Sequence, residues 1–150
     1  YGLLENAGSL PHSNVGTIRT EMQESMQKYA SVYKDRELLE KGFGNIRKLL
    51  DEKLHIQDDS LIWNTDLIES LELRNMLDLA YVTCFASIYR EESRGSHFRN
   101  DYPSRDDKKW LYHTLSYLQG KTLHNYKFDV NMDSLYPEEM PPVPLAERTY

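Results

Sequence analysis

Several features that define common protein classes are scarce in this sequence. One cysteine, Cys84, is present among 150 residues. No internal disulfide can therefore form, and this cysteine usage is typical of an intracellular protein. No apolar run approaches the roughly 20 residues that a membrane-spanning helix needs. Any association with a membrane is therefore expected to go through a partner.

Basic residues are scarce relative to acidic ones. The chain carries 18 Lys and Arg against 24 Asp and Glu, which gives a formal net charge of −6. A nucleic-acid-binding protein normally presents a basic patch or stripe. The tyrosines also lack the spacing of an RNA-binding sheet. The composition therefore argues against nucleic acid as a partner.

Motifs that carry catalysis or tight ligand binding are missing as well. The zinc patterns HExxH and paired CxxC, the phosphate loops GxGxxG and Walker A, and the nucleophile elbow GxSxG do not occur. A composite metal site from His97, His113, His124 and Asp101 is possible on paper, but hydrogen-bonded loop and strand histidines explain these residues better. We predict that this chain contains no catalytic residue, no cofactor-binding residue and no metal ligand.

The length is that of one domain, and its first part has a helical period. Residues 1–13 are interpreted as a linker or extended segment. Apolar residues then repeat every three or four positions, which predicts an antiparallel three-helix bundle of spectrin-repeat type over residues 14–92. The expected N-caps are Asn14, Asp35 and Thr65. The expected faces of the first two helices are Val15, Ile18, Met22, Met26, Tyr29 and Tyr33, and Leu38, Leu39, Phe43, Ile46, Leu49, Leu50 and Leu54.

The third helix is expected to run to about Arg90. Its second half is apolar on most faces, so we expect it to be buried between neighbours. Cys84 lies in this apolar segment, where a thiolate is disfavoured, and is predicted to pack in the core. Gly95 suits a position just past the end of this helix. The first residue is Tyr1, so we expect the chain to be a piece of a longer polypeptide.

Residues 93–150 are predicted to form a charged loop, a small β-hairpin and an extended Pro-rich tail. Alternating residues at 111–118 and 122–130 predict two strands, with a turn at 119–121. One face would carry Leu111, His113, Leu115 and Tyr117, and the facing set on the second strand would be Tyr126, Phe128 and Val130. The last stretch holds four of the six prolines and cannot form a regular helix or a central strand. Such a tail needs a surface to lie on.

The segment "REESRGSHFRNDYPSRDDKKWL" (residues 90–111) is dense in charges of both signs. Arginine and carboxylate side chains pair in fixed geometry. We therefore predict an ion-pair network that fastens this loop against another domain or subunit, with at least one arginine paired to an aspartate. The candidate residues are Arg94, His97, Arg99, Asp101, Arg105, Asp106, Asp107 and His113.

The same segment carries a family resemblance. "ESRGSHFRNDYPSRDDKKWLYHTL" resembles the C-terminal region of the flavoprotein subunit of succinate dehydrogenase and fumarate reductase. "EMQESMQKYASVYKDRELLEKG", "WNTDLIESLELRNMLDLA" and the closing "RTY" resemble other parts of that region, although Lys34 stands where the family usually has arginine. The resemblance covers residues 15–150. L-aspartate oxidase shares the "ESRGxHxxxDYP" core, but "WLYHTL" and "RTY" favour the succinate dehydrogenase side.

The resemblance implies a parent protein that binds FAD and oxidises succinate to fumarate. It would pass electrons to an iron–sulfur subunit and on to quinone at a membrane anchor. No segment here matches the family's flavin or substrate motifs, so this part is expected to be structural and inactive alone. The implied partners are the FAD-binding domain of the same chain, the iron–sulfur subunit and, indirectly, the anchor subunits. The implied location is the cytoplasmic side of a prokaryotic membrane or the mitochondrial matrix side. A stand-alone helical interaction module is the alternative from another class.

Overall fold

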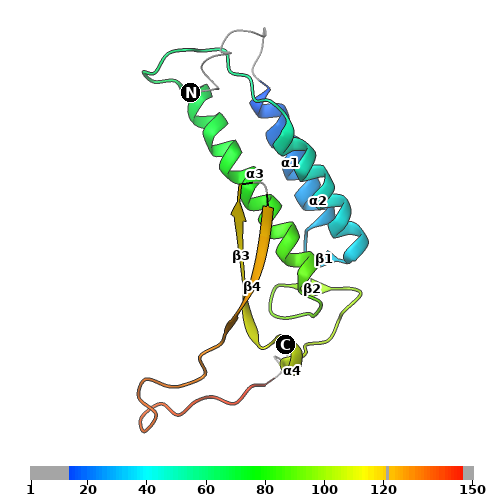
Figure 1. The fold of residues 1–150 in the computed structure, drawn as a ribbon, viewed down its shortest axis with the longest axis vertical. Helices are drawn as coiled ribbons and strands as arrows, with labels where there is room; N and C mark the ends of the chain where they lie inside the picture. The colour runs from blue at the N-terminus through cyan, green and yellow to red at the C-terminus, as the bar shows by residue number, and fades with distance from the viewer. Residues whose placement is uncertain (1–13, 121, 147–150) are drawn as a thin grey trace.

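The computed structural model describes residues 14–120 and 122–146. It is mainly helical, with a small antiparallel hairpin beside the helices (Figure 1). The predicted linker at 1–13 and the closing "RTY" lie outside the described residues. In chain order the elements are α1 (Val15–Tyr29), β1 (Tyr33–Lys34), α2 (Arg36–Asp51), α3 (Thr65–Tyr89), β2 (Phe98–Arg99), α4 (Asp107–Trp110), β3 (Tyr112–Gln119) and β4 (Thr122–Asp129).

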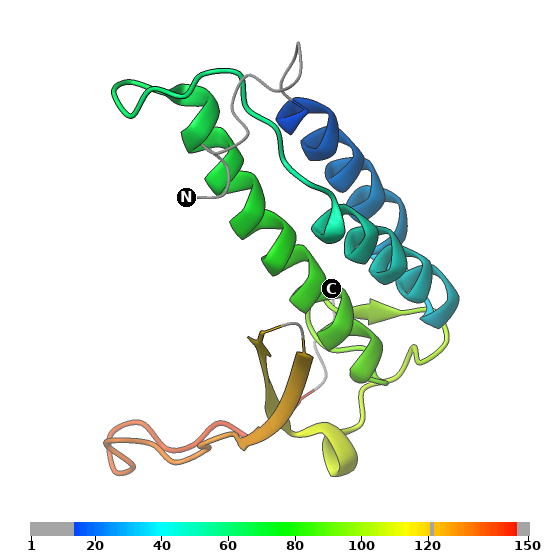
Figure 2. The same ribbon diagram turned by 45° about the horizontal axis from the view of Figure 1, so that its top comes forward.

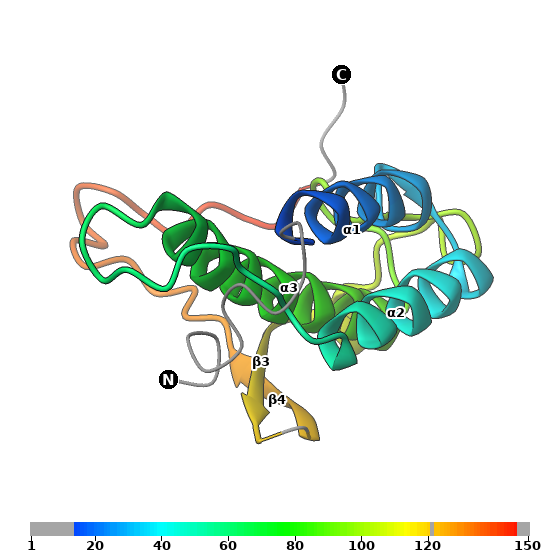
Figure 3. The ribbon, with the colours of Figure 1, turned by 90° about the horizontal axis from the view of Figure 1, so that it is seen from above.

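The three long helices α1, α2 and α3 share one apolar core. Figure 3 shows α1 and α2 on one side of α3. The predicted faces of α1 and α2 supply much of this core, because their apolar residues recur at helical spacing. The core-forming residues are Val15, Ile18, Met22, Ile46, Leu49, Leu54, Ile56, Leu73, Leu77, Ala80, Tyr81 and Cys84.

The first helix departs from the prediction at both ends. Asn14 precedes α1, but its side chain makes no capping bond. Its side-chain Nδ2 instead donates to the Lys53 carbonyl at 3.0 Å, and its Oδ1 accepts from the His55 backbone amide at 2.8 Å. The helix stops at Tyr29, and Tyr33 is an exposed residue of β1. The prediction for Tyr33 was wrong because the parallel pairing of β1 with β2 joins segments that are distant in sequence.

The second helix begins where predicted. Asp35 caps it, since its Oδ1 accepts from the Leu38 amide at 2.9 Å. The helix ends at Asp51, short of the expected Leu54, although Leu54 still fills the core from the following connection. Gly42 lies against α1, and a Cβ at this position would be 2.8 Å from the Tyr29 Cβ. The glycine therefore permits close approach of α1 and α2.

The third helix is capped by Asn64 rather than by Thr65. The Asn64 Oδ1 accepts from the Leu67 amide at 2.8 Å, while its Nδ2 donates to the carbonyls of Asp58 and Ser60. Asn64 thus caps the N-terminus of α3 and also holds the preceding loop in place. Cys84 is buried in the core as predicted, and burial raises the pKa of its thiol to about 11.

The second half of α3 buries Leu77, Ala80, Tyr81 and Cys84 as expected, and Leu79 is the exception there. Ile68, Leu71 and Leu79 are exposed, on the side of the helix opposite its buried residues. No helix among the described residues is long and apolar enough to cross a membrane.

The predicted hairpin is present, but β3 lies one residue later than expected and β4 ends one residue earlier, so that Leu111 and Val130 fall outside the strands. His113 pairs with Phe128 and Leu115 with Tyr126. Gly120 has a φ of +62° in the turn, a value that glycine adopts without steric cost. The predicted apolar face points away from the helices, because His113, Leu115 and Tyr117 are exposed while the alternating residues are partly covered. The described tail then turns away from the helices before returning toward α4 (Figures 1 and 2).

Candidate functional site

The charged segment folds into a compact connection that we call the joint (residues 90–112). It lies between the C-terminal end of α3, the short helix α4 and the start of β3. It contains a tight turn at residues 94–97. In this turn the Arg94 amide donates to the His97 carbonyl at 2.8 Å, and the His97 amide donates to the Arg94 carbonyl at 3.0 Å. Gly95, with a φ of +58°, lies in this turn. Its expected place directly after the helix was wrong, because α3 ends at Tyr89.

Glu92 is the centre of the joint and is completely buried. Its carboxylate accepts from Arg94 Nε at 2.7 Å, from Arg94 Nη2 at 3.0 Å and from the Asp106 amide at 3.0 Å. Arg90 Nη1 donates to the same carboxylate. Burial alone raises the pKa of a carboxyl group, but the hydrogen bonds from Arg94, Asp106 and Arg90 outweigh it and lower the pKa of Glu92. A buried charge is tolerated when it is paired and hydrogen-bonded in this way.

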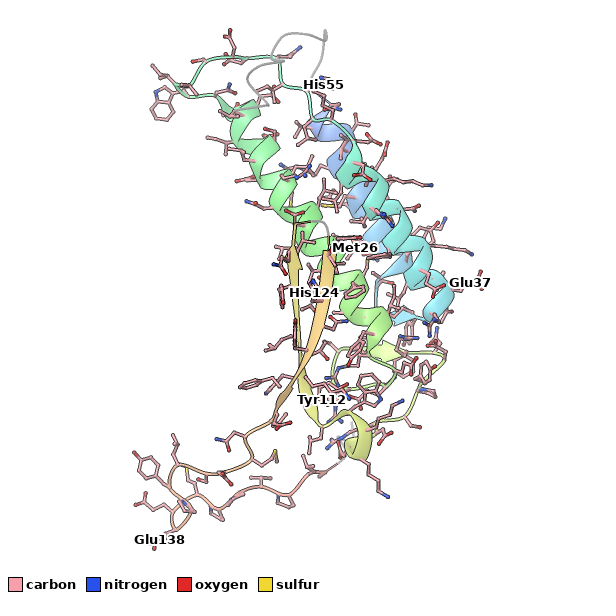
Figure 4. The ribbon with its side chains drawn as sticks, viewed as in Figure 1. Met26, Glu37, His55, Tyr112, His124 and Glu138 are labelled. Carbon is pink, nitrogen blue, oxygen red and sulfur yellow. The ribbon has the colours of Figure 1, made fainter. Side chains whose placement is uncertain are left out.

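Arg90 ties three elements together. Its guanidinium donates to the Trp110 carbonyl at 3.1 Å and to the Tyr112 carbonyl at 2.6 Å. It also donates to the Thr114 hydroxyl. The same group lies over the rings of Trp110 and Tyr112, at 5.4 and 5.2 Å from their centroids. Figure 4 shows Tyr112 at the foot of the hairpin, near α4. One side chain from the end of α3 thus fixes the start of the hairpin.

Asp107 links the joint to the tail. It accepts from Arg94 Nη2 at 2.8 Å and from Arg105 Nε and Nη2 at 2.7 Å. Hydrogen bonds from Arg105 and Arg94 lower the pKa of Asp107 to about 2. Arg105 Nη1 also donates to the Ala146 carbonyl at 2.9 Å. The network therefore runs from the buried Glu92 to the backbone of the tail.

Arg99 and Asp101 form a second pair on the other side of the joint. Arg99 is completely buried and makes a two-pronged contact with the Asp101 carboxylate, at 2.7 and 2.6 Å. Its Nη1 donates to the carbonyls of Ser87 and Ile88 in the last turn of α3 and to that of Arg90, which follows the helix. A cation at this end of a helix also complements the helix dipole.

Asp101 and Lys34 connect this pair to the rest of the helices. The Arg36 amide, at the start of α2, donates to Asp101 Oδ2 at 3.1 Å. The hydrogen bond from Arg99 outweighs burial and lowers the pKa of Asp101. Lys34 is buried nearby, and burial together with the charge of Arg99 lowers the pKa of its amine.

The remaining candidates lie at the edge of these networks. His97 Nε2 is 3.2 Å from the Arg90 carbonyl, and burial lowers the pKa of this histidine. Asp106 caps α4, because its side chain accepts from the amides of Lys108 and Lys109. His113 lies apart from the network, on the exposed face of the hairpin.

Sequence reasoning missed the two residues at the centre, Arg90 and Glu92. Both stand in the charged segment, and the spacing of Arg90, Glu92 and Arg94 at every second position was an available signal. It does not reveal burial, because charged residues are usually exposed. The predicted pairing of arginines with aspartates is present, in the pairs Arg94–Asp107, Arg99–Asp101 and Arg105–Asp107. The docking role of these residues stays a prediction.

This arrangement is built to hold structure. The carboxylates of Glu92, Asp101 and Asp107 are each bound to arginine, so none is poised as a base or nucleophile. Within the described ranges, no group of three or more His, Cys, Asp and Glu side chains could hold a metal ion. Gly95 lies in a turn closed by backbone bonds, and not between a strand and a helix as a dinucleotide-binding glycine would. The described residues of the joint do not form a dinucleotide-binding turn, and no chemical step through a flavin follows from them.

The fold and the joint therefore define a helical domain with an attached hairpin. Comparison with known proteins identifies its family. The chain matches the family described as "Fumarate reductase flavoprotein C-term" over residues 19–150. It belongs to this family, and it corresponds to the C-terminal domain of the flavoprotein subunit of succinate dehydrogenase and fumarate reductase.

Three relatives illustrate the match. The succinate dehydrogenase flavoprotein subunit of Rickettsia bellii is 43% identical over 141 residues, which cover 91% of this chain and 23% of the relative. The mitochondrial succinate dehydrogenase flavoprotein subunit of Oryza sativa is 41% identical over 150 residues, which cover 98% of this chain and 23% of the relative. A solved E. coli quinol fumarate reductase shares the fold with a TM-score of 0.80 and 28% identity, covering 94% of this chain and 24% of that one. The chain thus spans about a quarter of the length of its relatives.

Proposed function

We propose that this chain belongs to an FAD-dependent oxidoreductase that interconverts succinate and fumarate. The parent would pass electrons to an iron–sulfur subunit and on to quinone. The support is the family match and two relatives above 40% identity, both named succinate dehydrogenase. These names favour this branch over L-aspartate oxidase and over a stand-alone interaction module. The flavin and the substrate would be held by the rest of the parent.

Within that parent, the present domain acts as a scaffold. The observation that carries this proposal is the closed network around Glu92. The network uses charged residues of the joint for internal pairing and reaches the tail through the Arg105 bond to Ala146. Side chains committed to such a network position other elements rather than react. The helical part is proposed to be an antiparallel three-helix bundle of spectrin-repeat type, with the Pro-rich tail extended along a neighbouring surface.

The outward face of the hairpin is a proposed contact of this scaffold. Tyr117 and Tyr126 stack at 5.3 Å and their hydroxyls are 2.8 Å apart. Leu115 and Phe128 are exposed on the same face. A sheet face with this apolar content normally packs on another layer. The proposed neighbours are the FAD-binding domain of the same polypeptide and the iron–sulfur subunit, with the anchor subunits reached indirectly. The assembly would lie on the cytoplasmic side of a prokaryotic membrane, or on the matrix side in mitochondria.

The Arg94→Ala variant of the intact enzyme tests the scaffold. Removing this guanidinium takes two donors from the buried Glu92 and one from Asp107. We expect the flavin content and the recovery of the assembled enzyme to fall, while the KM for succinate of the enzyme that does assemble stays unchanged.

Arg36→Ala is the matched control, because Arg36 makes exposed ion pairs with Glu40 and Glu91. Exposed pairs of this kind contribute little to stability. An Arg94→Ala enzyme that assembles with normal flavin content but loses succinate binding would contradict the scaffold and indicate a role at the active site.

A further inference from the structure

One side of α3 exposes several large apolar residues. Ile68, Leu71 and Leu79 are 55%, 51% and 67% exposed. At about 100° per residue they lie within one arc of the helix, opposite the buried Leu73 and Leu77. A contiguous exposed apolar patch commonly marks an interaction site. The described elements cover only part of α3, so its bare side points to a missing neighbour.

The loop before α3 continues this exposure. Leu61 and Ile62 are exposed, and Trp63 is 94% exposed. Trp63 also has a φ of +56°, an unusual conformation for a bulky residue. Bonds from Asn64 Nδ2 to the carbonyls of Asp58 and Ser60, at 2.7 and 2.9 Å, hold the loop in place. The domain itself gains almost nothing from the indole, whereas exposed tryptophans are common anchors of interfaces.

The bare side also leads into a groove. Beyond Leu79, the same side of α3 carries Val82 and Ala86, which line an open cavity against β3. Thr114 and Ser116 of β3 and His97 of the joint also line this cavity. The apolar surface therefore extends along α3 from the loop toward the hairpin.

Acidic side chains predominate at the start of this surface, although Arg19 of α1 pairs with Glu72 and Arg74 follows in α3. Residues 57–73 contain five acidic residues and no lysine or arginine. A neighbour that covers this region therefore needs an apolar centre with lysine or arginine at its rim, since complementary charges favour the correct pairing.

We propose that Leu61, Ile62, Trp63, Ile68, Leu71 and Leu79, here called the bare face, are the seat of the preceding part of the same polypeptide. The inference rests on the proposed function, since it takes this chain to be one domain of a flavoprotein subunit. The solved E. coli relative has about three quarters of its chain outside the matched region. A tethered domain is present at high effective concentration and is therefore the favoured occupant. The occupant presents an apolar patch rimmed by basic side chains.

The double variant Leu71→Lys with Leu79→Lys tests this assignment in the intact flavoprotein subunit. It places two cations against the proposed basic rim. We expect amide hydrogen exchange across residues 65–80 to quicken by roughly tenfold or more, since two leucines lose their apolar cover. The melting temperature of the subunit should fall as well. Trp63→Ala should act in the same direction. The 150-residue chain alone should melt as before, because these side chains are already exposed in it.

Gln23→Lys with Gln27→Lys is the matched control. It adds the same charge at exposed positions of α1, away from the bare face. A double leucine variant that behaves like this control in the intact subunit would overturn the proposal. So would a stable subunit that fails only to bind the iron–sulfur subunit, because the occupant would then be the other chain. Loss of a dimer of the 150-residue chain would instead indicate a second copy as the occupant.

The proposed function and this inference fail separately. If Arg94→Ala leaves flavin content and assembly unchanged while the leucine variant loosens α3, the scaffold network is wrong and the bare face stands. The reverse result keeps the scaffold and rejects the bare face as the seat of the preceding domain.

Discussion

The helical part (residues 14–89) and the joint (residues 90–112) are held together in opposite ways. The helical part buries leucine, isoleucine, valine and methionine side chains against one another. The joint buries Glu92 and Arg99, and it satisfies them with charged and backbone partners. An apolar core gains free energy roughly in proportion to buried area. A buried ion pair breaks even only when every partner is present. The first region should therefore tolerate change gradually, whereas the second should fail when one partner is lost.

Removing the Glu92 carboxylate is the most severe test of this contrast. Glu92→Ala leaves Arg90 and Arg94 facing each other without their shared anion, so we expect a loss of about 3–5 kcal/mol in the free energy of unfolding. Urea denaturation of the 150-residue chain measures it. Leu73→Ala, at a fully buried core position, should cost about 2–5 kcal/mol.

Glu37→Ala is the control for removing a paired glutamate from an exposed site. Glu37 lies on the surface of α2 and pairs with Lys41. The substitution should leave the urea midpoint nearly unchanged. A Glu92→Ala loss no larger than that of Glu37→Ala would remove the distinction between the two regions.

Two glycines of α2 give a smaller test within the helical part. Gly42→Ala would place a Cβ 2.8 Å from the Tyr29 Cβ, so we expect it to destabilise the chain by about 1–3 kcal/mol through overpacking. Gly44 has no atom within 4 Å of the same added group, so Gly44→Ala should stabilise by up to about 1 kcal/mol. Thermal melting of both variants measures these opposite changes in stability. Equal shifts in one direction would mean that α1 and α2 do not approach as closely as described.

The smallest expected effect is a change in acid sensitivity. The pKa of Asp107 is lowered to about 2 in the folded state, below its ordinary value of about 3.9. The stability that this group contributes is therefore fully present above pH 4 and is lost as the pH falls toward 2. Asp107→Asn should flatten the fall in stability over that window.

Urea unfolding at several pH values between 2 and 6 measures this effect. The exposed Asp59→Asn is the control. If Asp107→Asn and the parent chain lose stability with the same slope below pH 4, the pairing of Asp107 with Arg94 and Arg105 is not maintained in solution.

The contrast between the helical part and the joint also explains which structural features could be predicted from the sequence. Val15, Ile18 and Met22 are buried as their spacing indicates, because helical periodicity is a local signal. The cap at Asp35 and the hairpin register are local as well. Tyr33 and Glu92 are set by contacts with distant segments, namely β2 and the start of α4. Such contacts leave no periodic pattern, so the start of a strand and the burial of a charge could not be predicted from neighbouring residues.

The candidate network shows the same limit. Arg94, Arg99, Arg105 and Asp107 were predictable as partners, because opposite charges lie close in sequence. Which carboxylate is central was not predictable, since Glu92 differs from the half-buried Glu91 only in its three-dimensional surroundings. Asparagine is a somewhat better N-cap than threonine, and the bonds of Asn64 to the preceding loop add to this preference.

The bond between Arg105 and Ala146 is made to a main-chain carbonyl. The guanidinium therefore recognises the course of the backbone and is indifferent to the side chain at position 146. Most amino acids could stand there and still accept the bond, provided that the chain passes at the same distance. Sequence drift in this part of the tail can thus proceed without detaching it, while the arginine that holds it has no such freedom.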